Sequence, residues 1–383
     1  MDPIYLDYNA TTPIDPEIAE TILPFIIHHY GNPSSTHAYG TFASQAVNNA
    51  RKQVSDMLNC DPEEVIFTSG GTESNNHAIK GIASTYRHIG NHIITSSVEH
   101  PAVVEVCEWL ETQGYRITYL PVDKLGSIDT VELETAITPD TILITIMHAN
   151  NEVGTVQPIR KITEIAHSRN VLVHTDAAQS AGKISVDVQD LGVDLLSLAG
   201  HKLYAPKGIG ALFVKKGTSL SKLMHGAGHE MGWRAGTENV IHITGLGKAC
   251  EMIKDNLDEY SRHMASMRNS LQTGLCLNIP TALFNGHPSQ RLPNTLSVSF
   301  QGLEADNLLS RLNRIAISAG AACHSDRIEI SSVLQAMAIP LDYAMGTLRI
   351  STGRFTTGEE IDIAISEITN AVNSGYTTKS QTG

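Results

Sequence analysis

Short apolar, β-branched runs alternate with helical stretches over residues 60–215, and this alternation constrains the fold more than any other feature. The runs typical of buried strands are residues 65–68, 92–95, 117–120, 142–146, 171–174, 195–198 and 211–214. Helical stretches such as 159–170 lie between most of them. Consecutive buried strands joined by helices form a mostly parallel sheet that is covered on both faces. We therefore predict an α/β fold with a mostly parallel, seven-stranded sheet flanked by helices.

The pattern changes near residue 250, where the regular alternation ends. The elements predicted beyond this point are helix 252–277, strand 295–300, helix 304–313, strand 315–318, a loop around Cys323, strand 347–350 and helix 358–373. A separate layer of strands and helices is typical of a smaller α+β domain. We predict a large domain over residues 16–254 and a small domain made of residues 1–15 and 255–376. The polar segment 377–383 is expected to be disordered.

Composition argues against several classes of partner. The chain has 40 acidic and 27 basic residues, and its formal net charge of −13 disfavours binding to nucleic acid or to an anionic membrane. Apolar runs of membrane-spanning length and the basic and apolar regions of a signal peptide are absent from the sequence. The five cysteines are scattered and never form a Cys-x-x-Cys pair, which is typical of free thiols in a reducing compartment. We expect a cytoplasmic protein.

A lysine and an aspartate follow neighbouring predicted strands with the spacing of a cofactor site. Lys202 comes shortly after a predicted strand, with Ser197 and His201 before it. Asp176 ends the preceding strand, and Gln179 follows it. The amine of a lysine can bond covalently to an aldehyde cofactor, and an aspartate can hold a protonated pyridine nitrogen. An isolated lysine is more often a solvated surface group, but this ordered set favours a cradle for pyridoxal phosphate.

Other polar residues also follow predicted strands. Gly71 and Thr72 lie where a strand gives way to a helix, and the free N–H groups of a helix N-terminus suit a phosphate. The alternative is an ordinary strand-to-helix turn, because P-loop and dinucleotide-binding motifs are absent from the sequence. His100 and Asn151 lie at the sheet edge where open α/β sheets bind ligands. An imidazole there can stack on a planar ring and exchange protons, although a lone histidine is more often structural.

Two further residues carry chemistry of their own. Cys323 lies among small residues in a predicted loop, and reactive thiols need such an accessible site. The other four cysteines are expected to be buried. Arg349 offers bidentate recognition of a carboxylate, although one arginine in a strand is weak support. The His-Glu pair at 229–230 lacks the second histidine of a zinc motif, so we expect no metal site.

Ordered motifs run along nearly the whole chain. They occupy residues 5–12, 30–35, 150–154, 200–202, 234–239, 291–295 and 354–357. In these segments the chain resembles the class V, fold-type-I enzymes that use pyridoxal phosphate, and specifically the class I cysteine desulfurases. The resemblance implies the fold of a fold-type-I pyridoxal-phosphate-dependent transferase and a homodimeric functional unit.

The resemblance also implies a role for each candidate residue around the cofactor. Lys202 would hold the cofactor covalently and move the α-proton of the substrate. Asp176 would pair with the ring nitrogen, Gln179 with the ring oxygen, and His100 would stack on the ring. The residues implied to hold the phosphate are Gly71, Thr72, Ser197, His201 and, from a second subunit, Thr237. Asn151 is also implied to lie beside the cofactor.

The reaction is likewise implied by the resemblance. Asn151 and Arg349 would bind the carboxylate of L-cysteine. Cys323 would take the substrate's sulfur as a persulfide while L-alanine is released. A sulfur-acceptor protein or an iron–sulfur scaffold protein would then receive the sulfur for iron–sulfur cluster or thio-cofactor synthesis.

Two alternatives stay open. The loop Ala-Ala-Cys-His-Ser-Asp resembles that of selenocysteine lyases, which act on L-selenocysteine, whereas Pro101 favours cysteine. The other alternative is a catalytically silent sulfur-relay scaffold, which would have no chemical need for Lys202, Asp176 and Cys323 together. Segment 226–232 departs from the usual desulfurase sequence, so the preference for substrate or partner at the rim of the site is also open.

Overall fold

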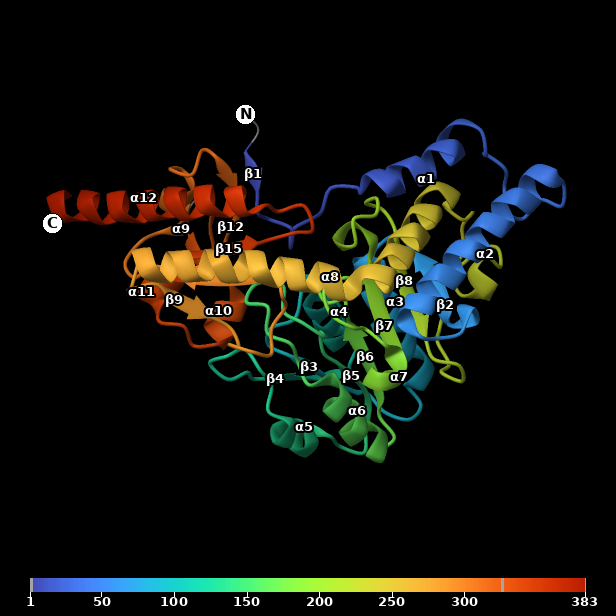
Figure 1. The fold of residues 1–383 in the computed structure, drawn as a ribbon. Helices are drawn as coiled ribbons and strands as arrows, with labels where there is room; N and C mark the ends of the chain where they lie inside the picture. The colour runs from blue at the N-terminus through green and yellow to red at the C-terminus, as the bar shows by residue number, and fades with distance from the viewer. Residues whose placement is uncertain (1–2, 325–326, 383) are drawn as a thin grey trace.

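A seven-stranded sheet forms the centre of the protein (Figure 1). The structure is a computed structural model that describes residues 3–324 and 327–382. The strand order is β2-β8-β7-β6-β5-β3-β4, and β8 alone pairs antiparallel with both of its neighbours. The strands are Val65–Thr68 (β2), His92–Ser96 (β3), Arg116–Leu120 (β4), Thr141–Thr145 (β5), Leu172–Asp176 (β6), Leu195–Ala199 (β7) and Gly210–Val214 (β8). The predicted mostly parallel, seven-stranded sheet is confirmed.

The inner strands of this sheet are buried on both faces, which explains why most of their residues are apolar. Successive residues of one strand point to opposite faces, and Ile93 packs into one hydrophobic cluster while Ile94 packs into another. Helices α3 (Gly71–Tyr86) and α4 (Pro101–Thr112) contribute to the first cluster, and α6 (Ile159–Ser168) contributes to the second. The shorter helices of this region are α5 (Thr130–Ala136) and α7 (Val188–Leu191).

Helix α8 (Val240–Asn278) connects the large sheet to the rest of the protein. Its first half, including Leu246, packs in the large-sheet core together with α2 (Ala38–Leu58), and its second half, including Leu271, packs in the small-sheet core. The helix begins twelve residues before the predicted start at 252. Most of residues 240–250 are buried. This part of the helix therefore lacks the polar face from which an amphipathic helix is recognised in a sequence. The predicted domain boundary at 254–255 falls inside α8.

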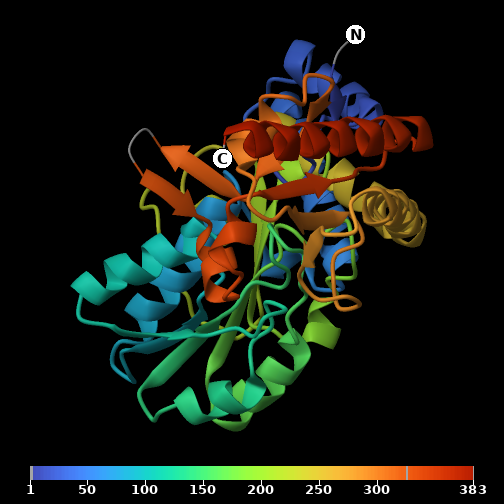
Figure 2. The ribbon, with the colours of Figure 1, turned by 90° about the vertical axis from the view of Figure 1, so that its left-hand side faces the viewer.

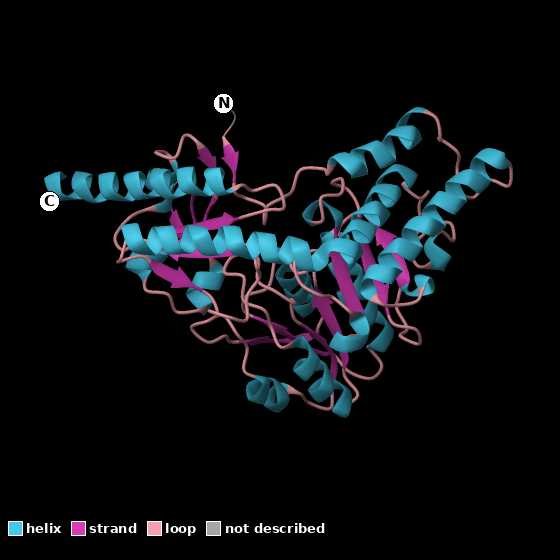
Figure 3. Ribbon diagram, viewed as in Figure 1, coloured by secondary structure: helices cyan, strands magenta, loops and turns pink. Residues whose placement is uncertain are grey.

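A second, smaller sheet lies at the other end of α8 (Figure 3). Its strand order is β12-β15-β10-β9, and all pairs are antiparallel. The strands are β9 (Leu283–Asn285), β10 (Thr295–Ser299), β12 (Ser318–Ala319) and β15 (Thr347–Ser351). Strand β1 (Ile4–Tyr5) pairs in parallel with β11 (Ile315–Ala316), so the N-terminus lies with this smaller unit. The helices there are α9 (Ala305–Leu309), α10 (Ser332–Ala336), α11 (Leu341–Ala344) and α12 (Gly358–Thr382).

The end of the chain differs from the prediction. Helix α12 continues to Thr382, so the segment expected to be disordered from residue 377 is helical up to that residue. An existing helix gains one hydrogen bond for each residue added without a new nucleation cost, which lets polar residues extend it. Although α8 and α12 are long, no helix within residues 3–324 and 327–382 is apolar enough over a sufficient length to cross a membrane.

Cys323 lies in a hairpin, whereas the sequence predicted a loop. Strand β13 (Ala321–His324) pairs antiparallel with β14 (Arg327–Ile330), and Cys323 is in register with Ile328 (Figure 2). Pairing of the two strands satisfies backbone groups that a loop of small residues would leave to water. The side chain of Cys323 lies outside the described part of the structure.

The crossing of α2 and α8 allows one testable prediction about stability. A Cβ atom at Gly247 would lie 2.6 Å from both Cα and Cβ of Ala50 on α2. Backbone atoms cannot move away cheaply, so Gly247→Ala should lower the free energy of unfolding by about 1–3 kcal/mol despite the better helix propensity of alanine. Ser266→Ala, at an exposed position of α8, is the control and should not destabilise. Equal denaturation midpoints for both variants would contradict the close crossing.

Candidate active site

A cavity of about 250 Å³ opens at the carboxyl ends of the central strands. Its lining residues are Ala10, Gly71, Thr72, Asn75, His100, Ala102, Met147, Ala149, Asn151, Asp176, Ala178, Gln179, Ala199, His201 and Lys202. The structure thus brings together most of the site residues proposed from the sequence. Ser197, Thr237 and Arg349 do not line this cavity.

The amine of Lys202 lies in the cavity, and its pKa is lower than that of an ordinary lysine. Nζ donates to the carbonyl oxygens of Asn9 and Ala10, the latter at 2.7 Å. Desolvation lowers the pKa of Lys202 to about 8, and the positive charge of Arg349 adds to this effect. A lysine with such a pKa is partly unprotonated near neutral pH and can attack an aldehyde.

Asp176 presents a carboxylate whose two oxygens are both held. Oδ1 accepts a hydrogen bond from the backbone N–H of Ala178 at 2.9 Å, and Oδ2 accepts one from Nδ2 of Asn75 at 2.6 Å. Sequence reasoning missed Asn75, although it lies one helical turn after Gly71 and therefore on the same face of α3. Asn75 is buried, and its Oδ1 has no hydrogen-bond partner among the residues that the structure describes. It offers a free acceptor beside the cavity.

His100 is held as a neutral imidazole at the start of α4. Its Nδ1 accepts a hydrogen bond from the backbone N–H of Ala102 at 3.1 Å, so the ring proton resides on Nε2. One side of the ring is open to the cavity, yet the surrounding protein desolvates it enough to lower the pKa of His100. Desolvation also lowers the pKa of His201 to about 4. Both histidines are therefore neutral, and His100 has one N–H left to donate.

The N-terminus of α3 offers backbone donors at one end of the cavity. Gly70 precedes the helix without any side-chain cap, and Gly71 and Thr72 line the cavity. Ser197, expected to hold a phosphate here, instead contacts Nε2 of His174 through its hydroxyl at 2.9 Å. Ser197 lies two residues before the end of β7, inside the sheet, and the residue of β7 that reaches the cavity is Ala199. A Cβ at Gly71 would lie 3.3 Å from the Cβ of Ala199, so the cradle is narrow.

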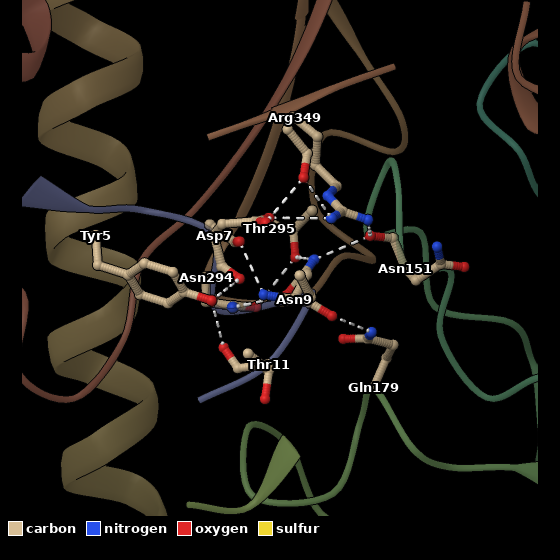
Figure 4. A network of polar contacts seen from close by, with 12 residues as sticks. Tyr5, Asp7, Asn9, Thr11, Asn151, Gln179, Asn294, Thr295 and Arg349 are labelled. Carbon is tan, nitrogen blue, oxygen red and sulfur yellow. Dashed lines mark hydrogen bonds and ion pairs between the residues drawn. The ribbon is translucent and has the colours of Figure 1, made fainter. Parts of the chain in front are cut away.

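Arg349 reaches the edge of the site from the small sheet (Figure 4). Its Nη2 donates to Oδ1 of Asp7 at 3.0 Å and to Oγ of Ser318 at 3.0 Å. Its Nη1 lies 3.5 Å from the backbone oxygen of Asn151. In the described part of the chain, Nε of Arg349 has no partner. The guanidinium is fixed by Asp7, a residue that sequence reasoning did not single out.

The four cysteines whose side chains are described do not line the cavity. Burial raises the pKa of Cys60 and of Cys107 to about 12 and also raises that of Cys250, so these thiols are poor nucleophiles. Cys276 is exposed in the last turn of α8 and Cys60 is only partly buried, so the expectation that all four are buried was wrong for these two residues. Over the described residues, no group of three or more His, Cys, Asp or Glu side chains could hold a metal ion.

The fold and the cavity define an α/β enzyme with a lysine of lowered pKa at the carboxyl edge of its sheet. The family described as aminotransferase class-V matches residues 4–363, and the chain belongs to this family. A protein from Methanosarcina thermophila named cysteine desulfurase IscS is 49% identical, over 94% of this chain and 89% of its own. A solved NifS-like protein has a TM-score of 0.91 at 37% identity, covering 97% of this chain and 99% of that one. A structure named SspA in complex with cysteine has a TM-score of 0.79 at 36% identity, covering 92% and 100%.

The lowered pKa of Lys202 predicts a pH dependence that can be measured without any substrate. The amine is protonated and unreactive below about pH 8 and free above it. In protein freed of any bound cofactor, labelling of Lys202 by an amine-directed reagent should therefore rise with a midpoint near pH 8, about two units below that of an ordinary lysine. Peptide mass spectrometry can follow Lys202 and the exposed Lys161 in the same sample. A midpoint for Lys202 near pH 10 would contradict the desolvated setting.

Proposed function

We propose that the protein is a pyridoxal-phosphate-dependent cysteine desulfurase that converts L-cysteine to L-alanine. The observation that carries the proposal is one cavity that holds both the low-pKa amine of Lys202 and the carboxylate of Asp176. The names of the relatives, cysteine desulfurase among them, support the same reaction. The complex of a structural neighbour with cysteine supports L-cysteine as the substrate.

The residues around the cavity fit pyridoxal phosphate. The uncapped N-terminus of α3 suits a phosphate, with Thr72 and His201 beside it, and Asp176 suits a protonated ring nitrogen. The unpartnered Oδ1 of Asn75 indicates that a polar group is missing from this buried place. Lys202 would hold the cofactor covalently. When bound, the cofactor supplies an electron sink for negative charge at the substrate's α-carbon.

The chain's own groups would position the substrate and move its proton. Arg349, whose guanidinium lies beside Asn151 at the edge of the site, would bind the carboxylate of L-cysteine. The Lys202 amine, neutral near its pKa of about 8, would take the α-proton of the substrate. His100, whose only ring proton is on Nε2, would stack on the cofactor ring and donate or return a proton from that atom.

Cys323 would accept the sulfur. Its thiolate attacks the sulfur of the substrate, so that an S–S bond forms while the C–S bond breaks, and the electron pair of that bond leaves with carbon. The carbon then takes a proton and L-alanine departs, while Cys323 retains the sulfur as a persulfide. A sulfur-acceptor or iron–sulfur scaffold protein would receive this sulfur next.

Supplying L-cysteine or L-selenocysteine separately tests the proposed reaction. The holoenzyme with a reductant should release alanine and sulfide from L-cysteine, and Cys323→Ala should lose nearly all sulfide release and the trapped persulfide. Cys276→Ala removes an exposed thiol outside the cavity and is the matched control, expected to keep wild-type activity. Turnover of L-selenocysteine alone would favour the lyase instead. Wild-type sulfide release from Cys323→Ala would refute the assigned sulfur acceptor.

The surface of α1 (Pro16–Ile27) and the start of α2 supports a homodimer. These helices project from the body of the protein (Figure 1), and they expose large apolar side chains. These are Leu23, Ile26, Ile27, Tyr39 and Phe42, joined by Tyr30 in the segment between the two helices, with Tyr30 and Ile26 exposed by 79% and 58%. Tyr30 stacks on Tyr39 with ring centroids 5.6 Å apart, and large apolar side chains exposed on neighbouring segments are typical of an interface. Thr237 is also exposed and outside its own chain's cavity, so it is available to the phosphate site of a second subunit.

Mixed dimers can test whether Thr237 acts in the partner's site. Thr237→Glu should repel the phosphate, and Lys202→Ala removes the reactive amine, so each variant alone should be inactive. A dimer of the two variants contains one site with both defects and one intact site, so it should recover about half of the wild-type activity. Sedimentation of each variant checks that it still dimerises. If Thr237 served its own chain's site, the mixed dimer would stay inactive.

A further inference from the structure

Lys183 is a buried amine with no role in the reaction described so far. It is 4% exposed and lies one turn after Gln179, in the segment that follows β6. Within residues 3–324 and 327–382, no carboxylate forms an ion pair with it. Its Nζ donates instead to Oε1 of Gln179 at 2.8 Å and to Oδ1 of Asn9 at 3.2 Å. A buried lysine directed at two amide oxygens needs an explanation, because removing an amine from water is costly.

The contact with Lys183 decides which end of the Gln179 amide faces the cavity. A lysine has only donors when charged, so it requires the oxygen of the amide. With Oε1 engaged, Nε2 of Gln179 is left as the donor on the cavity side, where it now reaches the backbone oxygen of Asn9 at 3.0 Å. The opposite orientation would place two donors against each other.

The same amine fixes the side chain of Asn9. Oδ1 of Asn9 accepts from Lys183 and from Nδ2 of Asn294, the latter at 3.0 Å, and Nδ2 of Asn9 therefore donates to Asn151 and Thr295 (Figure 4). Asn9 is 1% exposed, so its polar groups depend on these contacts. Its backbone oxygen contacts Nζ of Lys202. One buried amine thus orients two amides that surround the reactive lysine.

We propose that Lys183 is a positioning residue that locks the amide of Gln179 with its N–H toward the ring oxygen of the cofactor and holds Asn9 beside Lys202. The inference rests on the proposed function, since it concerns the cofactor that the cavity fits. Burial lowers the pKa of Lys183 well below its usual range. The donors of Lys183 meet the two amide oxygens of Gln179 and Asn9 at 2.8 and 3.2 Å.

A double-mutant cycle on the holoenzyme tests this role. A donor at the ring oxygen favours the more negative form of the bound cofactor, so losing it should raise the midpoint at which cofactor absorption changes with pH. Lys183→Met should raise that midpoint by about one pH unit and weaken cofactor binding about tenfold. Gln179→Leu should shift it in the same direction. Because both variants remove one interaction, the double variant should shift no further than Gln179→Leu alone.

Arg268→Met is the matched control. Arg268 is also buried and has no ion pair in the described part of the chain, but it contacts the backbone oxygen of Leu292 and lies outside the cavity. Its loss should lower thermal stability without moving the absorption midpoint or the cofactor affinity. If Lys183→Met behaves like this control, Lys183 only supports the fold and the proposal is overturned.

A second variant of Lys183 and the spectrum of the wild-type protein complete the test. Should Lys183→Met fail to fold, Lys183→Gln keeps a polar group but is too short to reach both oxygens, so it should produce a smaller shift of the same sign. An unchanged midpoint in that variant would equally overturn the proposal. Wild-type protein that binds no pyridoxal phosphate at Lys202 would instead refute the proposed function, which the wild-type spectrum reports before any variant is made.

Discussion

The buried hydrogen bonds of the segment around Asn9 join the two halves of this protein at its reactive centre. Strand β1 pairs with β11 in the smaller unit, and four residues later Asn9 contacts both the small sheet at Thr295 and the large unit at Asn151. Each of these polar groups is removed from water, so leaving one unpaired would cost about 1–3 kcal/mol. The N-terminal residues beside the cavity are therefore held in place only when the N-terminal segment and both sheets are folded together.

Desolvation determines the pKa values of several groups that line the cavity. It lowers the pKa of Lys202 and of both cavity histidines, while neighbouring donors hold the carboxylate of Asp176. Desolvation also acts on Glu99, the residue before His100, where burial raises the pKa of the carboxyl to about 8. Glu99 accepts from Ser96 and from the backbone N–H of Met147, which ties the ends of β3 and β5 together. Neutral bases beside the carboxylate of Asp176, which accepts two hydrogen bonds, are suited to moving protons at neutral pH.

Errors of the sequence-based predictions follow from interactions that are not local. Ser197 has the right residue type for a phosphate site, but its hydroxyl contacts His174 on the neighbouring strand. The start of α8 was missed because most of residues 240–250 are buried, with α1 and α2 packed against the helix, and show no polar face. Asn75 and Lys183 each lie one turn after a residue of the predicted site, Gly71 and Gln179, and this spacing was a signal that could have indicated them. Their contacts with Asp176 and Asn9, which are distant in sequence, appear only in the folded chain.

The sequence by itself determined the central sheet, the carboxyl edge where the site lies and the motif residues Asp176 and Lys202. The strands follow from hydrophobic periodicity, which is a local property of the chain, and the edge follows from the rule that parallel strands end on the same side of a sheet. Asp176 and Lys202 were found from their residue types and their order after two neighbouring strands. Only the tertiary structure decided which polar atoms face each other. The acidity of Lys202, the fixed tautomer of His100 and the anchoring of Arg349 by Asp7 depend on burial and on distances between segments up to 342 residues apart. Desolvation and hydrogen bonding act at a few ångströms, and those distances exist only in the folded chain.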